Sequence, residues 1–306
     1  MSQPRQIAPG ATYLITRRVL RRHFLFRPDA AINQLLVYAL VVSARRYGLQ
    51  VHALCAMSTH LHLVVTDVHG ILPRFLHFFH RIVALGTKVL RAWDGPVWDH
   101  EATSVVRLLT PAAVVEKIAY VLANPVVAGL VRHAREWPGA KVRVSELGRG
   151  ELRAARPEVY FNPANPQWPS EVALALTLPP SVEQDSKETF CRDVAAELER
   201  QEAEARAEVR RQGRGFLGAE RAGKVSPHDR ATSFEPLKDR NPTFAVGHGQ
   251  GGLWRRAAAA VREFRASYRV ALEQWCSGVR SAVFPAGTWW MRAFHNARTN
   301  DAVLTV

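Results

Sequence analysis

The sequence predicts an α+β protein in which a ferredoxin-like (RRM-like) antiparallel sheet with helices is followed by a mostly helical or irregular C-terminal extension. Three observations predict it. Extended and helical patterns follow one another in the order β-α-β-β-α-β over residues 11–108, one more helical pattern follows, and beyond about residue 145 the chain becomes proline-rich. That order is typical of a sheet covered by helices on one face, whose other face can accept the additional helix.

The first half of the unit contains a strand, a helix and a pair of strands. Residues 11–19 (ATYLITRRV) are rich in β-branched and aromatic side chains, which favours a strand. Residues 30–47 have helical apolar spacing between the start signal Pro28-Asp29 and the stop signal Gly48. Residues 49–66 divide into two extended runs around a tight turn near residues 57–59.

The second half starts with a helix over Leu72–Trp93, where large apolar residues recur at helical spacing. Residues 96–108 supply the fourth strand. Pro111 is tolerated in the first turn of a helix, so we expect the additional helix over 112–123, with a break or kink at Asn124-Pro125.

Composition divides the chain into three parts: the unit at residues 1–145, a Pro-rich linker with a charged helix and basic loop at 146–252, and a helical Trp/Arg-rich tail at 253–306. The charged helix is expected from Ser181 to Gln212, because Ser181 and Gln184 are spaced as a capping box. Its alternating Glu and Arg residues favour a solvated face.

The charge of the protein indicates a polyanionic partner. The formal net charge is +14, and residues 1–150 contain 19 Lys/Arg but only eight Asp/Glu. Such a basic surface attracts nucleic acid or anionic membrane, although a basic protein without a dedicated partner is the simpler alternative. No apolar run approaches the ~20 residues of a membrane-spanning helix, and the N-terminus lacks a signal-peptide pattern.

The cysteines indicate a reducing compartment. Cys55, Cys191 and Cys276 are odd in number and far apart, which suits neither a disulfide framework nor a CxxC zinc site. We therefore expect a cytoplasmic protein.

Two histidines give the sharpest local signal. His60 and His62 are two positions apart on a predicted strand, so both imidazoles project from the same face, and Leu61, Leu63 and Val65 from the other. Two such imidazoles can share one divalent ion. A polar strand face without a metal is an equally good explanation of the pair alone, and a metal site needs a further ligand.

The helix at 112–123 offers the missing groups. Glu116, Tyr120 and Asn124 follow one another at intervals of four and share one helical face. If this helix crosses the open sheet face, Asn124 can complete a metal site while Tyr120 reaches a substrate. Taken singly, Tyr120 is better explained as a packed tyrosine, Asn124 as a turn residue and Glu116 as an exposed glutamate.

The two motifs together resemble a known family. The stretch ALCAMSTHLHLVV, followed some 60 positions later by EKIAYVLANPVVAGLV, is similar to the HUH single-tyrosine transposases of the insertion-sequence-200-like group, and in particular to their REP-associated branch. That branch tends to have M-x-N-H-x-H-L near the histidines and Y-x-x-x-N-P-x-x-A-G-L-V in the last helix. The resemblance covers about residues 8–135. Ser58-Thr59 departs from the family's usual pair before the first histidine, and we expect this change to affect only the turn.

The resemblance implies a chemistry and a site. It implies that His60, His62 and Asn124 hold Mg²⁺ or Mn²⁺ and that Tyr120 is the nucleophile. The implied reaction is cleavage and rejoining of single-stranded DNA through a 5′-phosphotyrosine link, with hairpin DNA of the REP kind as the partner. No membrane is involved, and the protein would be a monomer or a homodimer.

Further residues are candidates for contacts with DNA. The basic ones lie at the end of the first strand and at the end of the first helix: Arg17, Arg18, Arg21, Arg22, Arg45 and Arg46. They can bind phosphates, or they can be solvated loop residues. In the tail, Trp289, Trp290 and Phe294 beside Arg292 can stack on unpaired bases or anchor the tail to the core. His77 and His80, three apart on a helix, can pair or face phosphates.

Three function classes follow. The first is a transposase that cuts and joins DNA, which agrees with the retention of Tyr120, His60 and His62. The second is a domesticated, non-cleaving protein that binds hairpin or single-stranded nucleic acid. The third, a replication initiator or relaxase, usually carries a third histidine or paired tyrosines, and neither pattern is visible in this chain.

Overall fold

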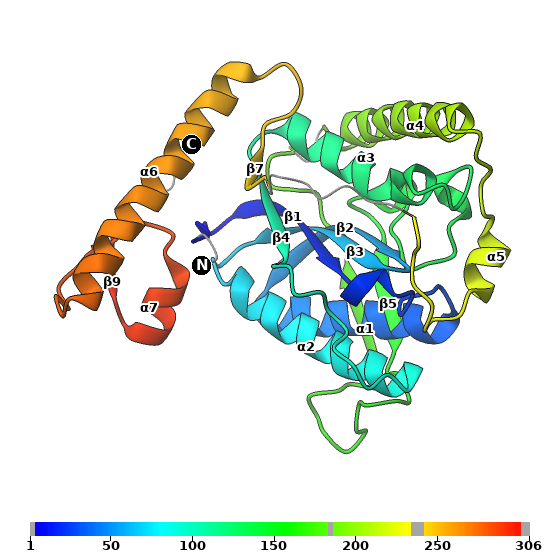
Figure 1. Ribbon diagram of the computed structural model, residues 1–306, viewed down its shortest axis with the longest axis horizontal. Coiled ribbons are helices and arrows are strands. Elements are labelled where there is room, and N and C mark those ends of the chain that lie inside the picture. Colours follow the sequence, from blue (N-terminus) through cyan, green and yellow to red (C-terminus); the bar gives the residue numbers. More distant parts are fainter. Residues whose placement is uncertain (1–3, 183–185, 234–241, 301–306) are drawn as a thin grey trace.

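The computed structural model describes residues 4–182, 186–233 and 242–300, and its centre is a five-stranded sheet (Figure 1). The spatial order of the strands is β2-β3-β1-β4-β7. The strands are β1 (Ala11–Arg18), β2 (Leu49–Met57), β3 (His60–Asp67), β4 (Ser104–Leu108) and β7 (Phe244–Ala245). The first four pair antiparallel, in the order and with the connections of a ferredoxin-like sheet, so the predicted fold class is confirmed.

The two faces of the sheet follow from the alternation of side chains along its strands. In the central pair, Ile15 of β1 lies opposite Leu63 of β3, and both are fully buried. The neighbouring pair, Thr16 opposite His62, points to the other face. The apolar face is therefore available to helices, and the face with the histidines is available to the chain that follows β4.

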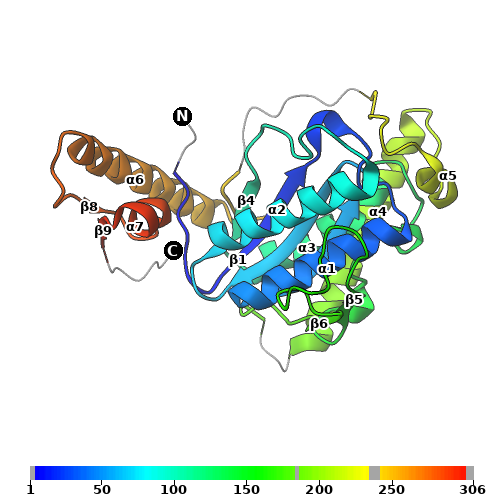
Figure 2. The same ribbon diagram turned by 90° about the horizontal axis from the view of Figure 1, so that it is seen from below.

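Helices cover both faces of the sheet (Figures 1 and 2). The helices α1 (Ala30–Tyr47) and α2 (Leu72–Arg91) pack side by side on the apolar face. The helix α3 (Pro111–Val127) crosses the other face, where it contacts β2 and β3, and α4 (Lys187–Arg211) packs on α3. The helix that the sequence predicted at 112–123 thus lies over the histidine face.

Several boundaries differ from the predictions. The helix α3 does not break at Asn124-Pro125 but continues to Val127 with Pro125 inside it. Both faces of this part of α3 are packed, and that packing maintains the helix although proline removes one backbone hydrogen bond. The strand β4 starts only at Ser104. The charged helix starts at Lys187 rather than Ser181, and Gln184 lies outside the described residues.

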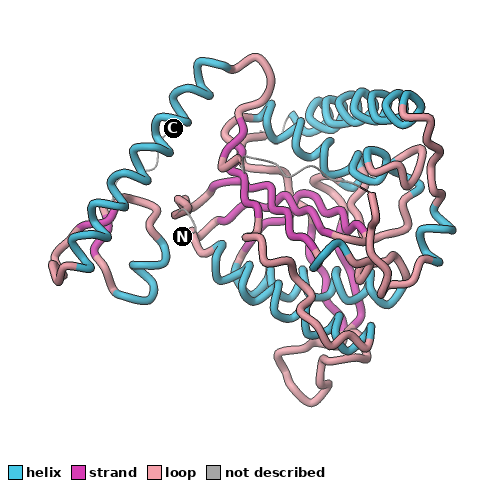
Figure 3. Tube along the Cα trace, in the orientation of Figure 1, coloured by secondary structure: helices cyan, strands magenta, loops and turns pink. Residues whose placement is uncertain are grey.

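The C-terminal extension contains short strands that its sequence did not reveal (Figure 3). The hairpin of β5 (Glu151–Ala155) and β6 (Glu171–Ala175) lies on α1. Between α4 and β7 lies α5 (Ala219–Lys224). The tail follows with α6 (Gly251–Cys276), β8 (Val283–Phe284), α7 (Trp289–His295) and β9 (Arg298–Thr299), so the helical character expected of the tail is present in α6 and α7. No described helix is both long and apolar enough to cross a membrane.

Candidate active site

The two predicted histidines lie together at the start of β3. The rings of His60 and His62 are 4.7 Å apart between centroids and are almost perpendicular. His62 is only 2% exposed because it lies under the crossing helix, whereas His60, at the strand end, is partly exposed. The strand geometry therefore places both imidazoles on one face, as their spacing predicted.

Each imidazole is held by a threonine hydroxyl at its Nδ1 atom. Thr16 Oγ1, from the opposing residue on β1, lies 2.8 Å from His62 Nδ1. Thr59 Oγ1 lies 2.9 Å from His60 Nδ1. A hydroxyl at Nδ1 fixes the ring orientation, and Nε2 is then the nitrogen that would coordinate a cation. The expectation that Ser58-Thr59 affects only the turn is wrong, since Thr59 contacts a candidate ligand directly.

The helix α3 brings Tyr120 to these histidines. The Tyr120 ring is 5.5 Å from the His62 ring, in an edge-to-face arrangement. Thr110 starts the helix, because its Oγ1 accepts a hydrogen bond from the Ala113 N–H at 3.0 Å and its hydroxyl donates one to the Val246 carbonyl at 2.8 Å. The predicted site depended on a helix that crosses the sheet. That helix is present, and it places Tyr120 beside the imidazoles.

Asn124 lies one turn after Tyr120 on the same helical face and is 8% exposed. Its amide Nδ2 donates a hydrogen bond to the Tyr120 carbonyl at 2.7 Å. Because the side-chain nitrogen donates this hydrogen bond, the side-chain oxygen is the Asn124 atom that would coordinate a cation. Asn124 is a buried helix residue, and the alternative of a turn residue is wrong.

A charged cluster flanks Tyr120 on α3. The Lys117 ammonium lies 6.0 Å from the centre of the Tyr120 ring and 2.6 Å from a Glu116 carboxylate oxygen. The other Glu116 oxygen lies 3.0 Å from Nδ1 of His248, which belongs to the extension. Glu116 is thus a partly buried, ion-paired residue rather than the exposed glutamate that we weighed for it.

A buried cysteine lies beside the histidines. Cys55 lies opposite His62 on β2, and complete burial raises the pKa of its thiol to about 12. Without a bound metal, the thiol is therefore neutral at physiological pH. Beside it, burial lowers the pKa of Lys141 to about 8.

The donor set suits a hard or borderline divalent cation. Two imidazoles with oriented rings and one amide oxygen are ligand types that Mn²⁺ accepts, and Mg²⁺ accepts the oxygen and water positions. Over the described part of the chain, no cluster of three or more His, Cys, Asp or Glu side chains is placed to hold a metal. A third protein ligand beside His60 and His62 would therefore be of another residue type, and Asn124 is the candidate on α3.

The predicted DNA-contacting arginines fall into two distant groups. Arg18 lies opposite His60 at one end of the sheet. Arg45 and Arg46 precede β2, whose first residue pairs with Asp67, so they lie at the other end. Seven residues of strand separate the two ends, roughly 23 Å at ~3.3 Å per residue. Only the group at residues 17–22 lies near the histidines.

Within the first group, backbone carbonyls hold two guanidinium groups. Arg17 donates to the Asp99 carbonyl at 3.1 Å and also to the Glu101 carbonyl. Arg22 donates to the Ser233 carbonyl at 2.6 Å and to its hydroxyl at 2.9 Å. These arginines are structural partners of loops, which their sequence positions did not indicate.

The structure separates the two roles weighed for the tail aromatics. Trp289 is buried, and its ring lies under the Arg74 guanidinium of α2. Trp290 and Phe294 are 58% and 59% exposed. Trp289 therefore anchors the tail, and the other two rings face solvent.

His77 and His80 of α2 have different environments. His77 is exposed, whereas the ring of His80 packs against Trp98 at 5.2 Å. Burial, with nearby Arg17 as the second cause, lowers the pKa of His80 to about 3. His80 is therefore a neutral, partly exposed residue that packs on Trp98.

Comparison with known proteins gives matches among solved structures alone. No protein-family model and no curated protein matches the chain. A REP-associated tyrosine transposase bound to a REP hairpin matches 48% of this chain and 85% of its own, at 17% identity and a TM-score of 0.41. A candidate transposase of Deinococcus radiodurans R1 matches 31% of this chain and 76% of its own, at 20% identity and a TM-score of 0.27.

Proposed function

We propose that this chain is a DNA transposase of the HUH single-tyrosine kind, which cuts and rejoins single-stranded DNA beside a hairpin. One observation carries the proposal: α3 crosses the sheet so that the Tyr120 ring lies 5.5 Å from His62, whose ring is 4.7 Å from His60. A tyrosine beside two oriented imidazoles suits attack on a phosphodiester, in which negative charge must be stabilised next to a phenol oxygen.

Each residue has a role in this proposal. Tyr120 is the nucleophile, and His60, His62 and Asn124 hold Mg²⁺ or Mn²⁺. A bound divalent cation would supply positive charge to the phosphate oxygens in the transition state. Lys117 adds a positive charge beside the attacking tyrosine. The threonines at 16 and 59 keep the two imidazoles oriented.

The bonds balance in both half-reactions. The Tyr120 oxygen forms a bond to phosphorus as the bond to the 3′-oxygen breaks, the phenol proton is released, and the 3′-oxygen takes up a proton. A 3′-OH then attacks the 5′-phosphotyrosine, which restores the phosphodiester and the phenol. Because one phosphoester is exchanged for another, no nucleotide triphosphate is needed.

Labelled hairpin strands test this proposal. With Mn²⁺, DNA labelled at the 3′ end should become covalently attached to the protein, and DNA labelled at the 5′ end should be released as a shorter strand ending in a 3′-OH. Tyr120→Phe should lose the attachment, and Tyr160→Phe, a tyrosine of the extension, should keep it. A wild-type protein that binds these hairpins without attachment would be a non-cleaving hairpin-binding protein.

A further inference from the structure

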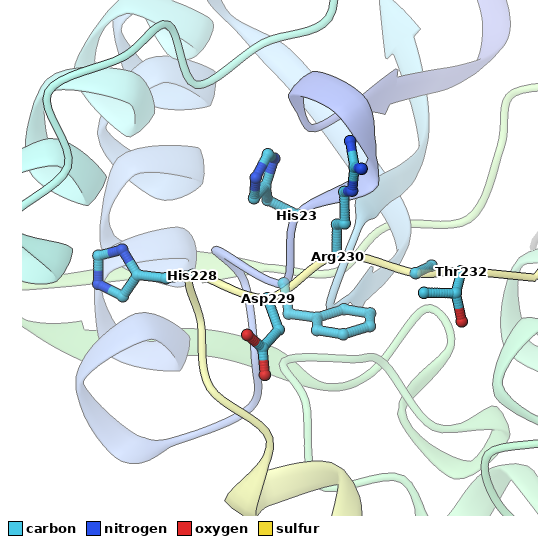
Figure 4. Close-up of a pocket in the computed structure, with 7 residues that line it drawn as sticks. His23, His228, Asp229, Arg230 and Thr232 are labelled. Carbon is cyan, nitrogen blue, oxygen red and sulfur yellow. The ribbon is translucent and has the colours of Figure 1, made fainter.

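A pocket next to the arginine-rich segment 17–22 is formed by two segments far apart in the sequence. It is an open surface pocket with a volume of about 610 Å³, lined by residues 23–24 and 228–232 (Figure 4). Its volume leaves room for one nucleotide, part of which would stay in contact with solvent. Two of its lining residues therefore belong to the chain that follows β1, and five belong to the C-terminal extension.

The extension segment is fixed in place by backbone pairing. The Phe24 N–H donates to the Asp229 carbonyl at 2.9 Å, and the Ala231 N–H donates to the Arg22 carbonyl at 3.1 Å. The Arg22 guanidinium also binds Ser233. These bonds form a short antiparallel bridge, so the extension segment forms a fixed wall of the pocket.

Pairing places the cationic groups on one side of this wall. His23 and Arg230 are direct partners in the antiparallel bridge, and directly opposed residues project to the same face. In Figure 4 both side chains extend to one side, while the Asp229 carboxylate extends to the opposite side. The face with His23 and Arg230 is therefore the one that would accept a phosphate.

Trp93 lies beside the two histidines that line the pocket. The Trp93 ring lies 4.9 Å from the His23 ring and 5.8 Å from the His228 ring. The indole N–H of Trp93 donates a hydrogen bond to the Pro96 carbonyl at 3.1 Å, which fixes the ring at the surface. Aromatic side chains beside cationic groups are the arrangement by which proteins bind unpaired nucleic-acid bases.

The pocket lies at the histidine end of the sheet. The Val19 N–H donates to the Thr59 carbonyl at 2.8 Å, and the Phe26 N–H donates to the Ser58 carbonyl at 3.1 Å. The segment 19–26 that carries His23 therefore packs on the turn directly before His60. A strand that enters the active site can pass this pocket within a few nucleotides.

We propose that this pocket binds one unpaired nucleotide of the DNA strand, with its base against the His23–Trp93–His228 rings and its phosphate at Arg230. This inference rests on the proposed function, because it names how that site selects a single-stranded flank. It assigns the 226–233 segment of the extension a part in substrate recognition.

Equilibrium binding tests the pocket without cleavage. The probes are a fluorescent DNA hairpin with single-stranded flanks and the same hairpin trimmed to its paired stem, measured by anisotropy in EDTA. For an Arg230→Ala, His228→Ala double variant we expect about 10-fold weaker binding of the flanked hairpin, which corresponds to loss of one stacked base, and an unchanged affinity for the trimmed hairpin. Arg149→Ala, which removes an exposed arginine near β5, should change neither.

A substitution in the DNA gives a second readout. A single abasic site is placed at each flank position in turn. At the nucleotide that occupies the pocket, the abasic site should lower the affinity of the wild-type protein for the hairpin. At the same position it should not lower the affinity of the double variant any further. Equal losses on flanked and trimmed hairpins, or full additivity at every flank position, would overturn the pocket assignment. A wild-type protein that binds neither probe would instead contradict the proposed function.

Discussion

The orientation of two imidazole rings is the residue-scale feature on which the proposed active site depends. Thr16 and Thr59 contact the Nδ1 atoms of His62 and His60, and one of them lies on a neighbouring strand. Such outer partners fix which ring nitrogen meets the cation, and their loss typically weakens metal affinity about 10- to 100-fold.

Replacing Thr16 with valine tests this support. The hydroxyl is lost with little change in shape, so we expect Mn²⁺ affinity, measured by calorimetry, to fall about 10-fold or more. Thr16→Ser keeps the hydroxyl and should stay close to the wild type. An unchanged affinity in Thr16→Val would show that the threonine does not orient His62.

A second buried histidine predicts a pH dependence of stability. Burial lowers the pKa of His52 to about 4, and its ring is held between the Thr177 carbonyl and the Thr66 hydroxyl, each at 2.8 Å. The unfolded chain takes up this proton near pH ~6.5 and the folded chain only near pH 4. His52 thus stabilises the fold fully above pH ~6.5 and progressively less as the pH falls towards 4, by up to about 1.4 kcal/mol per pH unit.

Urea unfolding of wild type and His52→Gln at several pH values between 7 and 4 measures this contribution. The difference in unfolding free energy between the two proteins should shrink as the pH falls. A pH-independent difference would mean that His52 protonates equally in both states.

At the scale of elements, α3 is decisive because it carries Tyr120, the proposed nucleophile, across the sheet. Its first turn depends on Thr110, which caps the helix and also binds Val246 next to β7. Thr110→Ala removes both bonds, so we expect a loss of about 1–2 kcal/mol in the unfolding free energy. Thr110→Ser should retain most of it in the same urea titrations, and an unaltered midpoint for alanine would contradict the capping role.

The elements of the N-terminal unit were largely predictable. The helix α1 was expected at its observed bounds, because Asp29 and Gly48 are strong start and stop signals. The extent of α3 was not, since a proline inside a helix is tolerated only where tertiary packing maintains the helix. The hairpin of β5 and β6 was missed because runs such as ELRAA and EVALA are short and contain few β-branched or aromatic residues.

The candidate site was only partly predictable from the sequence. The spacing of His60 and His62 gave their common face directly, and the helical spacing of Tyr120 and Asn124 gave theirs. The role of Thr16 depends on the pairing register of β1 with β3, which no local pattern specifies. Arg22 and Arg45 lie at opposite ends of the sheet because of the order of the strands, which the residues next to them in the sequence do not indicate.

At the scale of the whole molecule, the extension completes the core of the N-terminal unit. Phe161 is 2% exposed and packs edge-to-face on Tyr38 of α1 and on Trp168, at 4.9 and 5.0 Å. The Tyr38 hydroxyl donates to the Pro169 carbonyl at 2.7 Å. The side of α1 that faces away from the sheet is therefore covered by residues more than a hundred positions later.

Phe161→Ala should consequently cost as much as a substitution in the central core, about 3–5 kcal/mol of unfolding free energy. Tyr160→Ala changes the adjacent, 36% exposed residue and should cost under about 1 kcal/mol. Denaturant titrations of the full chain measure both. Equal, small effects would mean that the extension contributes little to the stability of the unit.

The central claim of the proposed function is that Tyr120 becomes covalently attached to DNA. Mass spectrometry of tryptic peptides, after reaction with hairpin DNA and nuclease trimming, locates that attachment. We expect the nucleotide on the peptide Ile118–Arg132, whose only tyrosine is Tyr120. An attachment on a peptide that contains another tyrosine, in a protein that otherwise cleaves the hairpin strand, would contradict the assignment of Tyr120 as nucleophile.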